Sequence, residues 1–282
     1  MSLKLTMRNA ISIDLEDWFC AYNLRIPVSE WDHQELRVAQ NTHRILELLA
    51  KHQTTATFFV LGWMAERVPE LVREIEAAGH EIATHGYSHT VLTEMTSEAF
   101  EQDLVKALEA TRACVQQEIL GYRAPSFTIT NKTRWAIDIL GRHGIRYDSS
   151  VFPLSYHPDY GIPNASLAIH QLGCLTEVPM SCAEIFGRRV PCSGGGYFRI
   201  YPYAVTRFLL RKCNAQGRPI IFYLHPWELD PGQPRQKLSW SKALRHYRNL
   251  DKTAERFDRL LGEFEFTSIR GVLADRTGMK AE

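Results

Sequence analysis

The chain has 282 residues, of which 45% are hydrophobic and 23% are charged, and this composition is typical of a globular protein with a sizeable core. Its 33 Lys and Arg residues nearly balance 32 Asp and Glu residues, so the net charge predicts neither nucleic acid nor an anionic membrane as a partner. No apolar run reaches roughly 18 residues, and residues 1–8 lack a signal-peptide core, so we expect a cytoplasmic protein without membrane insertion.

The chain alternates between predicted strands and predicted helices. Short apolar runs predict the strands, and longer segments with apolar residues at helical spacing predict the helices. This alternation is typical of a parallel sheet with crossover helices. In chain order we expect a strand over 10–15, a helix over 39–52, strands over 55–61 and 81–84 with a helix from about 69 between them, a helix over 97–117, a strand over 119–122, a helix over 132–143, strands over 145–147 and 177–179, a helix over 204–213, a strand over 219–224, a helix over 252–261 and a strand over 264–269.

Polar residues stand where several of these strands end. In a closed barrel of parallel strands the carboxyl ends all open on one face, where such folds build active sites. No composition break, linker or internal repeat divides the chain, so we expect a single domain over 1–282 in which distant strand ends become neighbours. The residues at the strand ends are Asp14, Glu16, Asp17, His85, His89, Arg123, Asp148 and His225.

His85 and His89 follow the strand over 81–84 at a spacing of four residues. If the turn between them is briefly helical, both imidazoles share one face, where they could bind a divalent ion together with a third ligand from elsewhere. Eleven histidines in this chain give such a pair by chance roughly 0.4 times, so the pair alone is weak evidence. Two surface histidines are the alternative.

The segment over 191–199 contains three consecutive glycines and looks at first like a phosphate cradle. It lacks both the Gly-Lys-Ser/Thr ending of a P-loop and the GxGxxG spacing, which argues against a nucleotide site. We expect a tight loop that lets a sugar or a backbone approach closely.

Five motif regions occur in order along the chain, namely Asp14 to Asp17, His85-x-x-x-His89, Arg123-x-Pro125-x-Phe127, Asp148-Ser149-Ser150, and Leu224-x-Pro226 around His225. This ordered set resembles the polysaccharide deacetylase family, the NodB-homology domain of carbohydrate esterase family 4. The resemblance covers about residues 11–226, and it is specific because five ordered motifs are far rarer than any one of them. The Ser193–Arg199 segment and the opening around Asp14 are similar to the branch with peptidoglycan deacetylase-like and allantoinase-like members, of the type found near exopolysaccharide gene clusters.

The resemblance implies an α/β fold, a distorted parallel barrel with loop insertions. Its core would span about 9–226, and a helix and strand over 250–270 would complete it. The implied activity is metal-dependent removal of acetyl groups from N-acetylated sugars.

The resemblance also implies a metal site on His85, His89 and an acid, with Zn²⁺ the expected ion because it polarises carbonyls and activates water. The family has two consecutive aspartates where this chain has Asp14-Leu15-Glu16-Asp17. If the strand continues regularly, Asp14 and Glu16 share a face, and if it breaks into a turn, Asp17 is the better ligand. The two alternatives stay open at this point.

The remaining roles follow from the same resemblance. Asp14 would be the catalytic base and Arg123 would keep it ionised, since a nearby opposite charge favours the charged form. His225 would protonate the departing amine, and Asp148 would orient that imidazole. Pro125 would fix its loop, and the aromatic residues expected near the sugar are Phe127, Tyr87 and Trp227.

The expected substrate is therefore an N-acetylhexosamine unit of a polysaccharide, its precursor or a peptidoglycan-like glycan. One alternative is an allantoinase-like hydrolase of a small amide. The other is a non-catalytic carbohydrate-binding relative, which should have lost Asp14 or His225, whereas this chain keeps both.

Overall fold

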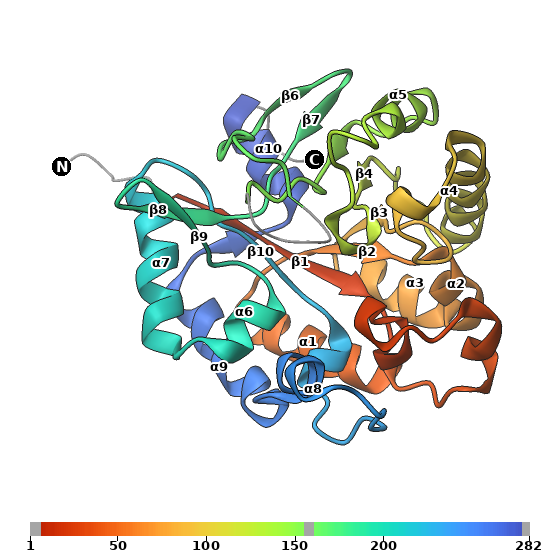
Figure 1. Ribbon diagram of the computed structural model, residues 1–282, viewed down its shortest axis with the longest axis horizontal. Helices are drawn as coiled ribbons and strands as arrows, with labels where there is room; N and C mark the ends of the chain where they lie inside the picture. Colours follow the sequence, from red (N-terminus) through yellow and green to blue (C-terminus); the bar gives the residue numbers. More distant parts are fainter. Residues whose placement is uncertain (1–6, 155–160, 278–282) are drawn as a thin grey trace.

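The computed structural model describes residues 7–154 and 161–277, and a mostly parallel sheet runs through its centre (Figure 1). The strand order is β10-β1-β2-β3-β4-β5-β7-β6, and β11 also pairs with β1. The strands of this sheet are β1 (Asn9–Leu15), β2 (Thr57–Val60), β3 (Glu81–Thr84), β4 (Gly121–Tyr122), β5 (Tyr147–Asp148), β6 (His170–Leu172), β7 (Leu175–Glu177), β10 (Ile221–Leu224) and β11 (Phe266–Thr267).

The parallel α/β architecture expected from the sequence is confirmed, but the sheet is a curled half-barrel. All pairings in it are parallel except the antiparallel pair β6 and β7. Its path starts at β10 and ends at β6, and no pairing among the described residues joins these two strands. The β6–β7 hairpin therefore ends the sheet where a full barrel would close.

Helices and short turns cover the sheet, and a separate hairpin of β8 (Cys182–Ile185) and β9 (Arg188–Pro191) lies outside it. The α-helices are α1 (Val38–Lys51), α2 (Gly62–Arg67), α3 (Pro69–Ala77), α4 (Ser97–Arg112), α5 (Trp135–Arg142), α6 (Gly195–Ile200), α7 (Tyr203–Ala215), α8 (Trp240–Tyr247), α9 (Leu250–Glu263) and α10 (Ile269–Thr277). The 3₁₀ turns are η1 (Trp18–Cys20), η2 (Tyr22–Leu24), η3 (Val28–His33), η4 (Leu92–Glu94), η5 (Pro125–Phe127) and η6 (Pro226–Leu229). None of the helices in the described part of the chain has the length and apolar character needed to cross a membrane.

Strand β1 positions the site because it lies between β10 and β2 and is buried along its whole length. Its side chains alternate between two faces. Ile11, Ile13 and Leu15 enter the main hydrophobic core, where each buried side chain contributes about 1.5–3 kcal/mol. Ser12 and Asp14 project to the other face, where both contact a buried arginine.

The sequence patterns located most elements but missed those with weak patterns. The segment over 191–199, expected as a loop, contains helix α6 from Gly195 onward. The β8–β9 hairpin turns through Phe186 and Gly187, both with positive φ, in a segment too short for a clear alternation. Helices α8 and α10 were also not predicted.

Candidate active site

Asp14 and Glu16 leave β1 together, and Glu16 lies beside both histidines of the His85/His89 pair. The backbone turns at this point, where the amide of Glu16 donates to the carbonyl of Asp14 over 2.9 Å. Glu16 Oε1 lies 3.0 Å from Nε2 of His85 and 3.0 Å from Nε2 of His89. All three side chains are buried. They form a group of ligand atoms that could hold a metal ion.

Asp17, the alternative acid, faces away from this group and caps backbone amides. Its Oδ1 accepts from the amide of Trp18 over 2.7 Å, and its Oδ2 accepts from the amides of Arg37 and Val38 over 2.6 and 2.8 Å. Burial raises the pKa of Asp17 to about 6 despite these three donors. The structure thus places Glu16 at the histidine pair and uses Asp17 to join η1 to the start of α1.

The two histidines converge without the helical turn that the sequence analysis considered. Strand β3 ends at Thr84, and the chain then turns through Gly86 and His89, both with positive φ. A non-glycine residue in this region costs about 1–3 kcal/mol, which the surroundings must offset. Asp103 of α4 does so by accepting from the amides of Tyr87 and Ser88 over 2.8 and 3.1 Å. The imidazole centroids lie 5.2 Å apart.

The hydrogen bond of His85 to the backbone defines which ring nitrogen faces Glu16. Its Nδ1 lies 2.7 Å from the carbonyl oxygen of Arg123, which can only accept, so Nδ1 carries the proton. In the neutral ring, Nε2 then presents a lone pair to Glu16 Oε1, which is also an acceptor. Two acceptors 3.0 Å apart repel unless a proton or a cation lies between them. This donor set fits a divalent metal ion with two nitrogen ligands and one oxygen ligand.

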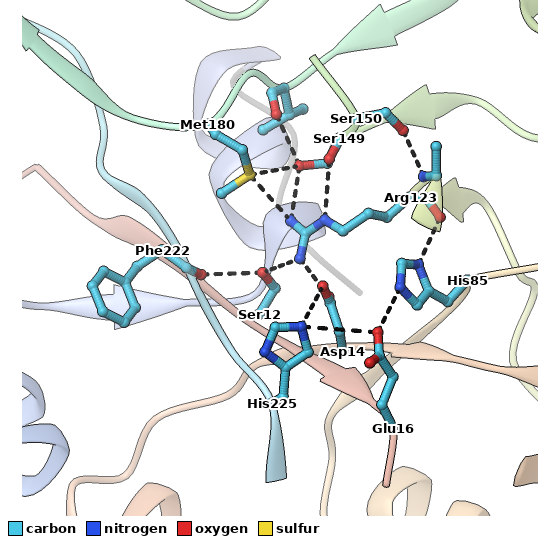
Figure 2. Close-up of polar contacts among 12 residues, drawn as sticks. Ser12, Asp14, Glu16, His85, Arg123, Ser149, Ser150, Met180, Phe222 and His225 are labelled. Atoms are coloured by element: carbon cyan, nitrogen blue, oxygen red, sulfur yellow. Dashed lines mark hydrogen bonds and ion pairs between the residues drawn. The ribbon is translucent and has the colours of Figure 1, made fainter. Parts of the chain in front are cut away.

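Arg123 is fully buried and anchors Asp14 (Figure 2). Its Nη1 donates to Asp14 Oδ1 over 2.6 Å and to the hydroxyl of Ser12 over 2.9 Å. Its Nε donates to the carbonyl of Ser149 and its Nη2 to the Ser149 hydroxyl, each over 3.0 Å. A buried guanidinium paired in this way fixes the carboxylate of Asp14 in direction, and the contact between Arg123 and Asp14 expected from the sequence is present.

His225, directly after β10, approaches the same acids from the other side, as Figure 2 shows. Its Nε2 lies 3.8 Å from Asp14 Oδ2 and 3.8 Å from Glu16 Oε1. Its Nδ1 lies 2.7 Å from Oε1 of Glu228, whose other oxygen accepts from Nε of Arg199 over 2.6 Å. Buried Arg199 and Glu228 thus connect to the partly exposed His225, whose imidazole faces the pair of acids.

The electrostatics of these groups are strongly coupled. Burial alone would lower the pKa of His225, but Glu16, Glu228 and Asp14 outweigh it and raise that pKa to about 9. Burial alone would raise the pKa of Glu16, but His89, His225 and His85 together hold it well below its usual value. Without a cation, the site therefore pairs an imidazolium with carboxylates.

Asp148 does not take the role expected for it. Its carboxylate accepts from the hydroxyl of Ser150 and lies beside Glu177 on the neighbouring strand β7. The partner of His225 is Glu228, three residues further along the chain in η6. Sequence reasoning missed Glu228 and Arg199, although the signal was present as an acid within one turn of His225 and an arginine at the end of the glycine segment.

A cavity of about 360 Å³ opens onto Asp14, Glu16, His85, His89 and His225. Of the expected substrate residues, Phe127 and Trp227 line it, whereas Pro125 starts the turn η5 that carries Phe127. Tyr87 lies elsewhere, with its hydroxyl 2.8 Å from Glu66 and the ammonium of Lys106 3.7 Å from its ring centre. The aromatic wall is built instead from the residues Phe127, Tyr197, Tyr223 and Trp227.

The glycine segment lets side chains approach its backbone closely. A Cβ on Gly195 would overlap the carboxylate of Glu228, and a Cβ on Gly194 would overlap the ring of Tyr223. A Cβ on Gly196 would meet nothing within 4 Å. Gly195 therefore makes room for Glu228, the residue that contacts His225. The close approach expected from the glycines is present, but the approaching group is a side chain of this protein rather than a sugar or a backbone segment.

The fold and site define a parallel α/β half-barrel with a His-His-Glu group beside an arginine-held aspartate and a histidine. Residues 29–147 match the family model described as polysaccharide deacetylase, and residues 149–274 match a domain of unknown function, DUF3473. Over residues 29–147 the chain therefore matches a polysaccharide deacetylase domain, the NodB-like type of carbohydrate esterase family 4. The site draws residues from both matched segments, His85 and His89 from the first and His225 and Glu228 from the second.

Curated relatives match part of the chain. A peptidoglycan deacetylase of Helicobacter pylori is 34% identical over 117 residues, which cover 42% of this chain and 39% of that protein. A chitooligosaccharide deacetylase of Rhizobium leguminosarum bv. trifolii is 40% identical over 105 residues, which cover 36% of this chain and 44% of that protein. The matches thus span less than half the length of these two relatives.

Solved structures agree with the fold over nearly the whole chain. A candidate polysaccharide deacetylase from Mycobacterium smegmatis has a TM-score of 0.59 and 23% identity, over 99% of this chain and 94% of that one. A pseudoenzyme of carbohydrate esterase family 4 from Bacillus anthracis has a TM-score of 0.53 and 16% identity, over 95% of this chain and 66% of that one. At these identities the likeness concerns the fold alone.

Proposed function

We propose that this protein is a metal-dependent hydrolase that removes N-acetyl groups from N-acetylhexosamine units of a glycan. The observation that carries the proposal is the convergence of Glu16, His85 and His89 with Asp14 and His225 on one cavity. The Helicobacter and Rhizobium relatives, both deacetylases, support the reaction class. A volume near 360 Å³ lies in the usual range for ligand pockets, roughly 300–1,000 Å³.

Glu16, His85 and His89 would hold the ion, and Zn²⁺ suits two imidazoles and one carboxylate with a position left open. When bound, such an ion supplies Lewis acidity that polarises the amide carbonyl and makes water easier to deprotonate. The backbone hydrogen bond on Nδ1 of His85 supports this assignment because it leaves Nε2 free to act as a ligand.

Asp14 would accept the proton of the attacking water. Arg123 holds one carboxylate oxygen, Oδ1, while Oδ2 faces Nε2 of His225 across 3.8 Å. The buried guanidinium holds the Asp14 carboxylate in place, and a carboxylate held in a fixed direction is suited to accept a proton from water.

His225 would deliver a proton to the amine as the carbon–nitrogen bond breaks. With a pKa of about 9, its ring is protonated at neutral pH in the metal-free site. Nδ1 is engaged by Glu228, so the proton available for transfer is on Nε2, the nitrogen that faces Asp14 and Glu16. The proposed base and the proposed acid thus lie 3.8 Å apart and both line the cavity.

The experiment is acetate release from N-acetylated oligosaccharides, measured with the metal-loaded protein, after chelation, and after Zn²⁺ is restored. We expect release that chelation abolishes and zinc recovers. The variant Asp14→Asn should lower the rate by roughly 10²–10⁴-fold because it removes the base. It should still bind zinc, because Asp14 is outside the His-His-Glu group.

The pseudoenzyme among the structural neighbours makes a non-catalytic relative worth testing. This chain retains Asp14 and His225 and brings them within 3.8 Å of one another, which favours the enzyme. Stoichiometric zinc binding without acetate release from any glycan would contradict the proposal. Turnover of a small cyclic amide by the same preparation would then indicate an allantoinase-like reaction.

A further inference from the structure

Positive and negative residues are nearly equal in number over the whole chain, but they are unevenly distributed along the sequence. Residues 185–250 contain twelve Lys and Arg residues and two acidic residues, a net charge of +10 where the whole chain has +1. Both acidic residues are buried and already paired, Glu228 with Arg199 and Asp230 with Arg37. The charge that this part of the chain presents to solvent therefore has a single sign.

The exposed cations concentrate on residues 234–248, here called the rim segment, which contains helix α8. Five of its residues are basic and all five are exposed, namely Arg235, Lys237, Lys242, Arg245 and Arg248. Among the described residues, none of these five forms a salt bridge. Their charges are therefore free to meet an external anion.

The same helix exposes apolar side chains. Trp240 is 78% exposed and Leu244 is 38% exposed. A spacing of four residues puts them on one face of α8, opposite the buried His246, which stacks on Trp227 at 4.6 Å. Trp240 and Leu244 thus form a small exposed apolar stripe that an apolar partner could cover.

The rim segment also borders the cavity of the candidate active site. Helix α8 packs beside α6, as Figure 1 shows. Arg245 of α8 and Ile200 of α6 both line that cavity, and Ile200 is 40% exposed. A partner on this face would therefore lie next to the cavity entrance.

We propose that the rim segment docks on an anionic lipid membrane surface. A short helix with an apolar stripe that contains tryptophan, flanked by lysine and arginine, is suited to lie in the interface of a bilayer. Anionic headgroups attract the cations, and the hydrocarbon boundary takes up Trp240 and Leu244. A soluble acidic polysaccharide would satisfy the cations alone and would leave both apolar side chains in water, so the membrane is the better match.

The test is binding of the full chain to vesicles without any glycan, so its result does not depend on the proposed hydrolysis. Vesicles of phosphatidylcholine with a quarter phosphatidylglycerol are compared with pure phosphatidylcholine by sedimentation. We expect binding to the anionic vesicles only, weakening as salt shortens the Debye length from about 10 Å at 0.1 M to about 3 Å at 1 M. The structure describes all six tryptophans, and Trp240 is the one classed as exposed. Its fluorescence should therefore shift to the blue when the protein binds the vesicles.

Two variants separate the charge from the apolar contact. Lys237→Gln with Lys242→Gln should lower the partition coefficient by about 25-fold, since each cation near an anionic surface contributes roughly a factor of five. Trp240→Ser with Leu244→Ser should lower it by at least about tenfold. The matched controls are Lys132→Gln with Arg134→Gln, and Leu36→Ser, at exposed residues elsewhere. Unfolding midpoints of all variants verify that they fold.

Three results would overturn the proposal. The first is equal binding to anionic and neutral vesicles. The second is a loss of binding in the controls as large as in the rim variants. The third is tight binding of a soluble polyanion, such as polygalacturonate, with an affinity that Trp240→Ser and Leu244→Ser do not change. That result would make a polysaccharide the partner of the rim segment.

Discussion

Glu228 contacts Nδ1 of His225 across 2.7 Å while Arg199 contacts the other oxygen of Glu228 across 2.6 Å. All three groups line the cavity, and Arg199 and Glu228 are buried. A buried carboxylate between an imidazole and a guanidinium fixes the direction of the imidazole and favours its charged form. The protonation of His225 therefore depends on a residue outside the five sequence motifs.

Glu228→Gln should move the pH dependence of the reaction. Glu228 is one of the groups that raise the pKa of His225 to about 9, so loss of its charge lowers that pKa. A general acid works only while it is protonated, so the alkaline limb of the kcat profile should shift toward neutral pH. We also expect kcat to fall by roughly 10²-fold with little change in KM. Steady-state acetate release between pH 6 and 10 provides the measurement.

Asp148→Asn is the matched control for that experiment. Asp148 contacts Ser150 and Glu177, so its substitution should leave the alkaline limb in place. A shift in the Asp148 variant and none in the Glu228 variant would contradict the structure. Because Glu228→Gln leaves Arg199 buried without its anion, it should also cost about 3–5 kcal/mol of unfolding free energy, which urea titration measures separately.

The sequence predicted most of the fold because periodicity reports burial. Strands β1, β2, β3 and β10 are apolar throughout, and their buried runs mark them clearly. A loop is expected where helix α6 lies, since three consecutive glycines are poor helix formers. In the structure Gly195 leaves room for Glu228 and Gly194 leaves room for Tyr223, which residue spacing does not show. The open edge at β6 depends on an antiparallel hairpin whose strands have three residues each, too short for a pattern to show.

The sequence predicts those residues of the candidate site that stand at strand ends. Asp14, His85, His89, Arg123 and His225 meet because parallel strands end at one edge of the sheet. The choice between Glu16 and Asp17 depends on where the backbone turns after β1, which residue spacing alone does not specify. The partner of His225 was missed because a motif names residues but not the hydrogen bonds they make.

Glu16→Gln and Asp17→Asn should separate the two acids that the sequence left open. Glu16 lies against both histidines, so its substitution should weaken zinc binding by at least about 100-fold. Asp17 accepts from three backbone amides and asparagine cannot satisfy them all, so we expect a loss of about 1–3 kcal/mol in stability with zinc binding retained. Zinc titration and urea unfolding of both variants test this, and the reverse pattern would make Asp17 the ligand.

The pair Asp148 and Glu177 should make the protein less stable as pH rises. The two carboxyl groups lie opposite one another on β5 and β7. Burial raises the pKa of both, and the neighbouring Asp148 raises that of Glu177 further, to well above its usual value. The folded state therefore keeps a proton that the unfolded chain releases above about pH 4.3, so the unfolding free energy should fall from there toward the raised pKa. Glu177→Gln mimics the protonated form and should flatten this decline, whereas Glu184→Gln at an exposed site should not. If the unfolding free energy of the protein and of its Glu177 variant changed equally between pH 5 and 9, the pair would not hold the proton.

Gly195→Ala should disable His225 without touching it. The added methyl group would overlap the carboxylate of Glu228, which Arg199 and His225 hold in place, so Glu228 must move away from the imidazole. We expect kcat to fall by roughly 10²-fold and the alkaline limb to shift toward neutral pH, as in Glu228→Gln. Gly196→Ala is the control, since its methyl group meets nothing within 4 Å and lies in the same helix, where alanine stabilises by about 0.5–1 kcal/mol relative to glycine. Equal pH profiles for the two alanine variants would mean that Glu228 does not govern His225.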